Sequence, residues 1–336
     1  MDTRRQRPPA LLDDVLDELS VSRSWAFNSL SGSMLHKASG MRVSPTNGIF
    51  CAGHEYRLSA QDIEIEGDVP LGAGASGTVW RGTIKTTATP IAIKVLRVEN
   101  SSERQHLLNE VRTLIESEGC PYLVQWHAGF ASQKGQVWLV LELMDCGSLS
   151  GLRRPSGLPP RILAAVGLQV LKGLDHLHAR KFLHNDIKPG NVLLNTDGSV
   201  KLTDFGITRS LQNSICCTCM GTQTYLAPEK MEPENGYSLP SDIWSFGIMM
   251  YELASGSHPF ASANGSFAAI YQSLIDEPEP RLHEDQGHPS SLCHFIECCL
   301  MREPAKRASA TELLSHEFLA LAASQDELSE WLATRN

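Results

Sequence analysis

The hydrophobic pattern of this chain changes near Gly147, and this change restricts the possible folds more than any other feature. Before Gly147, short segments rich in β-branched residues predict strands at 79–84, 91–95 and 137–142. Residues 101–117 between them have a helical pattern. After Gly147, the spacing predicts mainly helices, at 162–179, at 241–254 and in shorter segments up to Leu321. Because the two parts are unlike, we predict an α+β fold of two lobes with a cleft between them.

The same pattern divides the chain into three regions. Residues 1–62 contain an Arg/Pro cluster and a stretch rich in Ser and Gly, so we expect a largely disordered extension. Residues 63–320 form the folded domain, with a small lobe at 63–143 and a large lobe at 147–320. Residues 321–336 are left as a C-terminal tail.

Charge and hydropathy argue against several kinds of function. The formal net charge is −9 over 336 residues, which disfavours nucleic acid as the main partner because phosphate binding needs a basic surface. No apolar run approaches the roughly 18 residues that a membrane span needs. The first residues lead into no apolar segment of the kind found in signal peptides. We therefore expect a cytoplasmic protein without membrane insertion.

The nine cysteines are best interpreted as reduced thiols. Their number is odd, and no secretion signal accompanies them. None of their spacings makes a convincing zinc ligand set, although His294 lies near Cys293 and Cys298.

A glycine-rich segment at 72–79 reads Gly-x-Gly-x-x-Gly-x-Val. The same glycines occur before the helix of a dinucleotide-binding fold, but here a strand follows. A glycine-rich hairpin between two strands allows its backbone N–H groups to approach phosphate oxygens, which side chains would block. Alone, the motif is weak, since a flexible turn has the same composition.

Lys94 and Glu110 strengthen the phosphate interpretation. Lys94 follows Ala92 and Ile93 on a predicted strand, where a fixed ammonium group can pair with phosphates. Glu110 lies in the predicted helix, and its apolar neighbours Leu107 and Val111 indicate that this face is turned inward. An exposed Glu–Lys surface pair is the alternative for Glu110.

Residues 184–191 read His-Asn-Asp-Ile-Lys-Pro-Gly-Asn, and Asp204-Phe205-Gly206 follows. Here the chain resembles eukaryotic protein kinases, whose catalytic loop is His-Arg-Asp-x-Lys-x-x-Asn followed by Asp-Phe-Gly. The resemblance implies a bilobal kinase fold that uses ATP and Mg²⁺. Asp186 would orient the substrate hydroxyl, Lys188 would steady the moving phosphoryl group, and Asn191 and Asp204 would bind Mg²⁺.

The resemblance spans residues 63–320 and implies further roles. Met144 would present the hinge backbone to adenine, with Leu141 at the gatekeeper position. Asp242 would brace the catalytic loop, and Glu229 would pair with Arg307. The full expected ATP site is Leu71, Gly72, Gly74, Gly77, Val79, Ala92, Lys94, Glu110, Leu141, Met144 and Leu193.

Asn185 departs from the family pattern, because kinases usually have Arg before the catalytic Asp. In the family, that Arg pairs with a phosphate on the activation loop. We hypothesise that Arg209 and His106 hold such a phosphate here, His106 being one helical turn before Glu110. Arg209 as a solvated loop cation is the alternative.

The activation segment resembles that of MAP kinase kinases. In that family two hydroxyl residues separated by three others precede a Gly-Thr pair, and Ser214 and Thr218 fit this spacing before Gly221-Thr222. Phosphorylation of Ser214 and Thr218 by an upstream kinase would add charge and order the loop. Thr222 would hydrogen-bond Asp186 and Lys188.

Both ends of the chain carry segments that resemble MAP kinase kinase docking sites. A basic and apolar N-terminal cluster resembles the peptide that binds the acidic groove of a MAP kinase, and comprises Arg4, Arg5, Arg7, Leu11 and Leu12. A solvated basic terminus is the alternative. The apolar spacing at 12–21 resembles a nuclear export signal, which would imply shuttling to the nucleus. An amphipathic helix that packs on the kinase is the alternative. Residues 326–332 resemble a docking site for the upstream kinase, or a helix that closes the large lobe.

The sequence thus predicts a dual-specificity MAP kinase kinase. Its substrate would be the Thr-x-Tyr activation loop of a downstream MAP kinase, and its activator a MAP kinase kinase kinase. One alternative is another Ser/Thr kinase of the same broader STE-type group. A second, of a different class, is a pseudokinase scaffold, which the intact Lys94, Asp186, Asn191 and Asp204 argue against.

Overall fold

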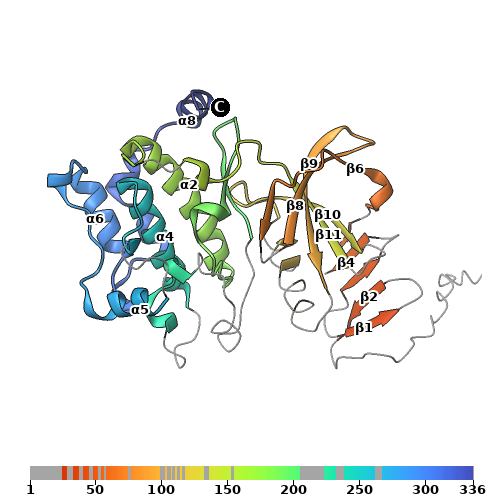
Figure 1. The fold of residues 1–336 in the computed structure, drawn as a ribbon, viewed down its shortest axis with the longest axis horizontal. Coiled ribbons are helices and arrows are strands. Elements are labelled where there is room, and N and C mark those ends of the chain that lie inside the picture. The colour runs from red at the N-terminus through yellow and green to blue at the C-terminus, as the bar shows by residue number, and fades with distance from the viewer. Residues whose placement is uncertain are drawn as a thin grey trace, which may run out of the picture.

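The structure is a computed structural model. Figure 1 shows that one part of it is rich in sheet and the other is mainly helical. The residues described are 25–28, 33–37, 41–44, 48–51, 54–56, 58–74, 77–98, 103, 107, 110–111, 114–115, 118–131, 136–152, 155–204, 223–231, 238–261 and 267–335. None of the helices among them is long and apolar enough to span a bilayer.

A six-stranded antiparallel sheet forms the centre of the small lobe. Its strand order is β10-β11-β9-β8-β6, with β7 paired to β8. The strands are β6 (Ile63–Ile65), β7 (Gly72–Gly74), β8 (Gly77–Ile84), β9 (Thr89–Arg97), β10 (Trp126–Ala131) and β11 (Gln136–Glu142). The predicted strands at 79–84, 91–95 and 137–142 lie within β8, β9 and β11. Of the helix predicted at 101–117, the described residues, among them Leu107, Glu110 and Leu114, are helical.

The large lobe is built around two long helices, as the periodicity predicts. They are α2 (Pro160–Ala179) and α4 (Leu239–Ser255), which contact each other. Shorter elements surround them: β12 (Val192–Leu194), β13 (Val200–Leu202), α5 (Phe267–Asp276), α6 (Ser290–Cys299), α7 (Ala310–Leu313) and the 3₁₀ helix η9 (Glu317–Leu321). Gly247 allows α4 to lie close to α6, because a Cβ there would be 2.7 Å from that of Cys299. The two-lobed α+β fold is therefore confirmed.

The region before the small lobe differs from its prediction. We expected residues 1–62 to be largely disordered, but a five-stranded antiparallel sheet lies within them. Its strands are β1 (Trp25–Asn28), β2 (Ser33–His36), β3 (Arg42–Ser44), β4 (Gly48–Cys51) and β5 (His54–Tyr56). Strands β3, β4 and β5 contact β10 of the small lobe (Figure 1). The sheet is ordered because it buries Met34, Val43 and Ile49 in a core shared with the small lobe. Residues 1–24 lie outside the described part of the chain.

The C-terminal tail contains α8 (Gln325–Ala333), which packs on α2 of the large lobe. Ser324 begins it with a capping box, in which its hydroxyl accepts the Glu327 N–H and the Glu327 carboxylate accepts the Ser324 N–H. Leu328 and Leu332 are buried, and Glu327 forms an ion pair of 2.8 Å with Arg161. The tail thus forms a helix that closes the large lobe, which is one of the two interpretations given above for residues 326–332.

Candidate active site

Strand alternation places Lys94 on the face of β9 that is directed toward the large lobe. Ile91 and Ile93 belong to the hydrophobic cluster on one face of the sheet, whereas Ala92 and Leu96 belong to the main core on the other. Because side chains on a strand alternate, Lys94 lies on the same face as Ala92 and Leu96.

Lys94 joins the two lobes through a pair of buried ion pairs. Its Nζ is 2.6 Å from Glu110 Oε1 and 2.7 Å from Asp204 Oδ1. Burial alone would lower the pKa of Lys94, but the carboxylates of Asp204 and Glu110 outweigh it and raise the pKa. The amine is therefore a fixed positive charge, held between one carboxylate from each lobe.

The glycine-rich hairpin of β7 and β8 leaves open space beside this charge. Within 4 Å of a Cβ built on Gly72 or Gly74 there is no other atom, so these glycines expose the backbone of β7. Gly77 has a φ of +126°, and a Cβ there would lie 2.4 Å from the carbonyl oxygen of Val95. Glycine is thus required at Gly77 by the turn and its close contact with β9. Leu71, just before the hairpin, is 55% exposed.

The adenine-site residues predicted from the resemblance come from both lobes. Ala92, Leu141 and Met144 are buried, and Val79 and Leu193 are partly buried against the same core. A β-bridge between Ser148 and Leu193 connects the segment after Met144 to β12. These side chains form an apolar neighbourhood on the same side of the sheet as Lys94.

Asp186 lies at the centre of a polar cluster in the large lobe. Its carboxylate accepts hydrogen bonds from Lys188 Nζ, at 2.9 and 3.1 Å, and from Asn191 Nδ2 at 2.8 Å. Asn191 Nδ2 also donates to the backbone oxygen of Asp186 at 2.8 Å. The amide of Asn191 thus ties the Asp186 side chain to the backbone of the same loop.

Asp242 holds the backbone of residues 184 and 185, just before Asp186, by hydrogen bonds. Its carboxylate accepts the N–H of His184 at 2.9 Å and the N–H of Asn185 at 2.8 Å, and it lies 2.9 Å from His178 Nε2. Burial acts to raise the pKa of Asp242, but the hydrogen bond from His178 and the charge of Lys230 lower it overall. Asp242 is therefore an ionised group that organises the residues just before Asp186.

Lys230 is a buried neighbour of the candidate site that was not predicted from the sequence. It is buried, and its Nζ donates to Asn185 Oδ1 at 2.9 Å. Burial lowers the pKa of Lys230, while Asp242, Glu229 and Asp186 oppose that effect. The only available signal was its place directly after Ala227-Pro228-Glu229.

Glu229 and Arg307 are brought together as the resemblance implies. Arg307 Nη1 and Nη2 donate to the two carboxylate oxygens of Glu229 at 2.7 and 3.0 Å. Arg307 also donates to the Pro240 carbonyl at 2.7 Å, and its guanidinium lies over the Trp244 ring. Arg307 thus connects the segment that contains Glu229 to the start of α4, by the bidentate pair on one side and by Pro240 and Trp244 on the other.

Several predicted residues fall outside the described part of the chain. They are the phosphosites Ser214 and Thr218, the loop residue Thr222, the proposed phosphate ligands Arg209 and His106, and the docking residues Arg4, Arg5, Arg7, Leu11 and Leu12. Their predicted roles stay predictions.

The residues present fit a nucleotide with a divalent cation. Asp204 and Asn191 offer the hard oxygen ligands that Mg²⁺ prefers, and the ammonium group of Lys94 lies beside Asp204. The exposed backbone at Gly72 and Gly74 gives phosphates access to N–H donors. The arrangement therefore combines a phosphate cradle, a cation site and an acid next to a lysine.

The model of the protein kinase domain matches residues 65–319. The chain belongs to the protein kinase family. The match covers both lobes, and with them both the Lys94–Glu110–Asp204 ion pairs and the polar cluster around Asp186.

Curated relatives of this kinase are named as MAP kinase kinases, which confirms the resemblance. Mitogen-activated protein kinase kinase 3 of Arabidopsis thaliana is 34% identical over 308 residues, which are 89% of this chain and 57% of that protein. This kinase thus spans a little over half the length of that relative. Mitogen-activated protein kinase kinase 1c of Physcomitrium patens is 35% identical over 274 residues, 78% of each chain. Mitogen-activated protein kinase kinase SIPKK of Nicotiana tabacum is 36% identical over 261 residues, 75% of this chain and 72% of its own.

Proposed function

We propose that this chain is a MAP kinase kinase that transfers the γ-phosphoryl group of ATP to Thr and Tyr in the Thr-x-Tyr loop of a MAP kinase. The observation that carries the proposal is the double ion pair of Lys94 with Glu110 and Asp204, since a kinase needs this lysine fixed between its lobes. The names of its relatives support the choice of substrate class.

The chain's own residues supply positioning and charge for this reaction. ATP with Mg²⁺ provides the phosphoryl group and neutralises part of its charge. Lys94 pairs with phosphate oxygens, and Asn191 and Asp204 hold the cation. Asp186 accepts the proton of the substrate hydroxyl. Lys188, whose Nζ is 2.9 Å from Asp186 Oδ2, stabilises negative charge on the phosphoryl group in transfer.

Regulation follows from the same proposal. A MAP kinase kinase kinase phosphorylates Ser214 and Thr218, and the added charge orders the activation loop. Arg4, Arg5, Arg7, Leu11 and Leu12 dock the MAP kinase substrate. We further propose that the protein acts in the cytoplasm and shuttles to the nucleus.

A kinase assay on a catalytically inactive MAP kinase with an intact Thr-x-Tyr loop tests the proposal. The full chain is compared with Asp186→Ala, in each case with and without acidic replacements at Ser214 and Thr218. Asp68→Ala is the matched control, because Asp68 is an exposed acid outside the site. Phosphosites are mapped by mass spectrometry.

We expect phosphate on both Thr and Tyr of the substrate, raised by the acidic replacements. Asp186→Ala should reduce the rate by about 10²–10⁴-fold because it removes the group that receives the proton, and Asp68→Ala should leave it unchanged. Phosphate on generic Ser or Thr substrates alone would assign the chain to another branch of the kinase family. If enzyme phosphorylated in cells binds ATP but transfers nothing, the scaffold alternative is favoured.

A further inference from the structure

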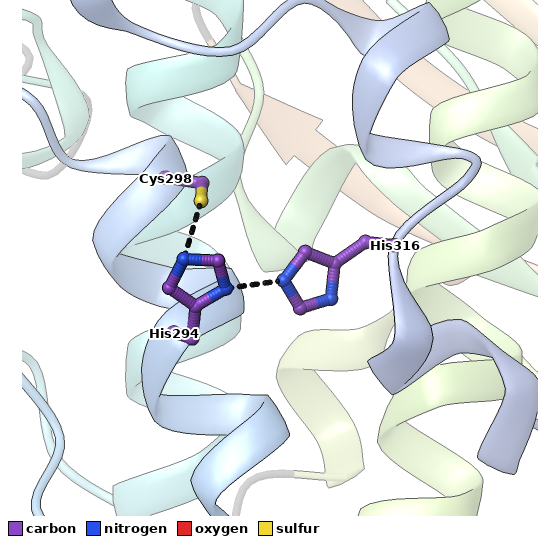
Figure 2. Close-up of side chains that lie close together, drawn as sticks. All are labelled: His294, Cys298 and His316. Atoms are coloured by element: carbon purple, nitrogen blue, oxygen red, sulfur yellow. Dashed lines mark hydrogen bonds between the residues drawn. The ribbon is translucent and has the colours of Figure 1, made fainter.

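Three side chains that bind transition metals in other proteins meet where α6 contacts η9, in the large lobe and outside the active site. His294 and Cys298 are one turn apart on α6, and His316 immediately precedes η9 (Figure 2). His294 Nδ1 is 2.8 Å from His316 Nε2, and His294 Nε2 is 3.7 Å from Cys298 Sγ. One potential ligand atom from each residue lies within 4.8 Å of the others.

The hydrogen bonds of the cluster fix where its protons lie in the metal-free protein. His316 Nδ1 accepts the N–H of Phe318 at 3.1 Å, so a neutral His316 carries its proton on Nε2. That proton is donated to His294 Nδ1, which leaves the proton of neutral His294 on Nε2, facing Cys298 Sγ. The Nε2 protons of His294 and His316 therefore lie within the cluster, together with the thiol proton of Cys298.

The cluster rests on an apolar floor and faces solvent on its other side. The buried ring of Phe295 packs edge-on against His316 and also contacts Phe318. Burial and the neighbouring His294 lower the pKa of His316, so its ring is neutral at physiological pH, as a metal ligand must be. Burial raises the pKa of the Cys298 thiol, so a cation has to displace its proton. His294 is exposed, so its ring has room to turn when its hydrogen bonds to His316 and Cys298 are exchanged for a metal ion.

The separations suit a tetrahedral cation with mixed nitrogen and sulfur ligands. With Zn–N of about 2.0–2.1 Å and Zn–S of about 2.3 Å, neighbouring ligand atoms lie about 3.3–3.6 Å apart. One ligand atom from each residue lies within 4.8 Å of the others, so an ion at this site draws the three side chains closer together. Imidazole and thiolate together favour zinc over magnesium or calcium.

We propose that His294, Cys298 and His316 form a binding site for one Zn²⁺ ion, with the fourth position open to water. The ion displaces the thiol proton of Cys298 to solvent, and each histidine binds it through one ring nitrogen and keeps its proton on the other. The bound ion links α6 to η9. Binding through His316 Nε2 moves the remaining ring proton to Nδ1, so the hydrogen bond from the Phe318 N–H is lost.

Cobalt binding to the full chain, stripped of metal by a chelator, tests the proposal. Co²⁺ replaces Zn²⁺ and gives a thiolate-to-metal absorption band only when a cysteine sulfur is a ligand, which excludes binding by Asn191 and Asp204. The variants are Cys298→Ser and His294→Ala, with Cys293→Ser as the matched control on the same helix. Circular dichroism in chelator verifies that each variant is folded.

We expect one Co²⁺ per chain with this band, displaced by Zn²⁺. The band should be absent in Cys298→Ser, the affinity should fall by at least ~10-fold in His294→Ala, and Cys293→Ser should match the wild type. The amide signal of Phe318 in NMR spectra should shift on zinc addition, and Zn²⁺ should raise the Tm of the wild type but not of Cys298→Ser. A wild type without the band, or a band that Cys298→Ser retains, overturns the proposal, and kinase activity has no bearing on either outcome.

Discussion

Asn185 occupies a backbone position that suits asparagine better than the arginine usual in the family. Its φ is +66°, in the left-handed region where Asn is enriched. Its side-chain oxygen accepts a hydrogen bond from Lys230, and its backbone N–H is held by Asp242. Within the described part of the chain, Asn185 thus serves as a local brace of the catalytic loop.

Substitutions at Asn185 separate the backbone effect from the lost hydrogen bond. Asn185→Gly and Asn185→Ala both remove the acceptor for Lys230, but only Ala is strained at a positive φ. We expect Asn185→Ala to reduce the free energy of unfolding by about 1–2 kcal/mol more than Asn185→Gly does. Urea denaturation of the two variants measures the difference. A Gly variant as unstable as the Ala variant would show that the backbone conformation is not costly here.

Asp242 should make stability depend on pH in the acidic range. Its pKa is lowered in the folded state, so the ionised carboxylate contributes stability above the unfolded pKa of about 3.9. That contribution is lost as the pH falls through the lower folded pKa. We expect Asp242→Asn to lower the free energy of unfolding by about 1–3 kcal/mol at neutral pH, because an amide NH₂ group would face N–H donors where a carboxylate oxygen now accepts. The difference in free energy of unfolding between this variant and the wild type should shrink below about pH 4. Chemical denaturation across pH measures it, and a difference that stays constant in acid would contradict the assignment.

At the scale of single elements, the long periodic segments were predictable and the short ones were not. The apolar periodicity of α2 and α4 and the β-branched runs of β8, β9 and β11 carry their structure locally. The strands β1 to β5 have three or four residues each, too few to show a period. These strands form because Met34, Val43 and Ile49 are buried against another part of the molecule. No local sequence pattern reveals such a contact.

The helix α8 is held to the large lobe by its buried side, and the contribution of that side to stability can be measured. Leu328 is fully buried, so Leu328→Ala should lower the free energy of unfolding by about 2–5 kcal/mol. Glu330→Ala is the control on the same helix, because Glu330 is exposed and should change stability by less than about 0.5 kcal/mol. Thermal unfolding of both variants compares them. Equal effects would mean that α8 is not packed on the large lobe in solution.

At the scale of the whole molecule, the residues of the candidate active site were easier to single out from the sequence than the contacts around them. Lys94, Asp186, Asn191 and Asp204 are recognisable because their chemistry dictates residue type and spacing. The contact of Lys230 with Asn185 joins residues 45 positions apart, and His316 lies far along the chain from His294 and Cys298. Such partners come together only through packing, so their sequence neighbours give no indication of them.

The attachment of the N-terminal sheet to the small lobe gives a test at this scale. A Cβ on Gly129 of β10 would lie 2.7 Å from the Ile49 side chain, so the two sheets are in close contact. Ile49→Ala should lower the free energy of unfolding by about 2–5 kcal/mol, whereas Arg42→Ala, at an exposed site on β3, should have little effect. Calorimetry of both variants measures this. A wild-type Tm for Ile49→Ala would show that the N-terminal sheet does not share the core of the small lobe.

Ile49 belongs to the same continuous core as Leu107 and Val111, which flank Glu110. Glu110 in turn holds Lys94, so the N-terminal sheet and the nucleotide site draw on one set of packing contacts. Free energies linked in this way are reciprocal: whatever tightening a bound nucleotide gives to the sheet, the sheet returns as nucleotide affinity. A substitution in the N-terminal sheet that weakens nucleotide binding would therefore also reduce, by the same free energy, the stability that the sheet gains when nucleotide is bound.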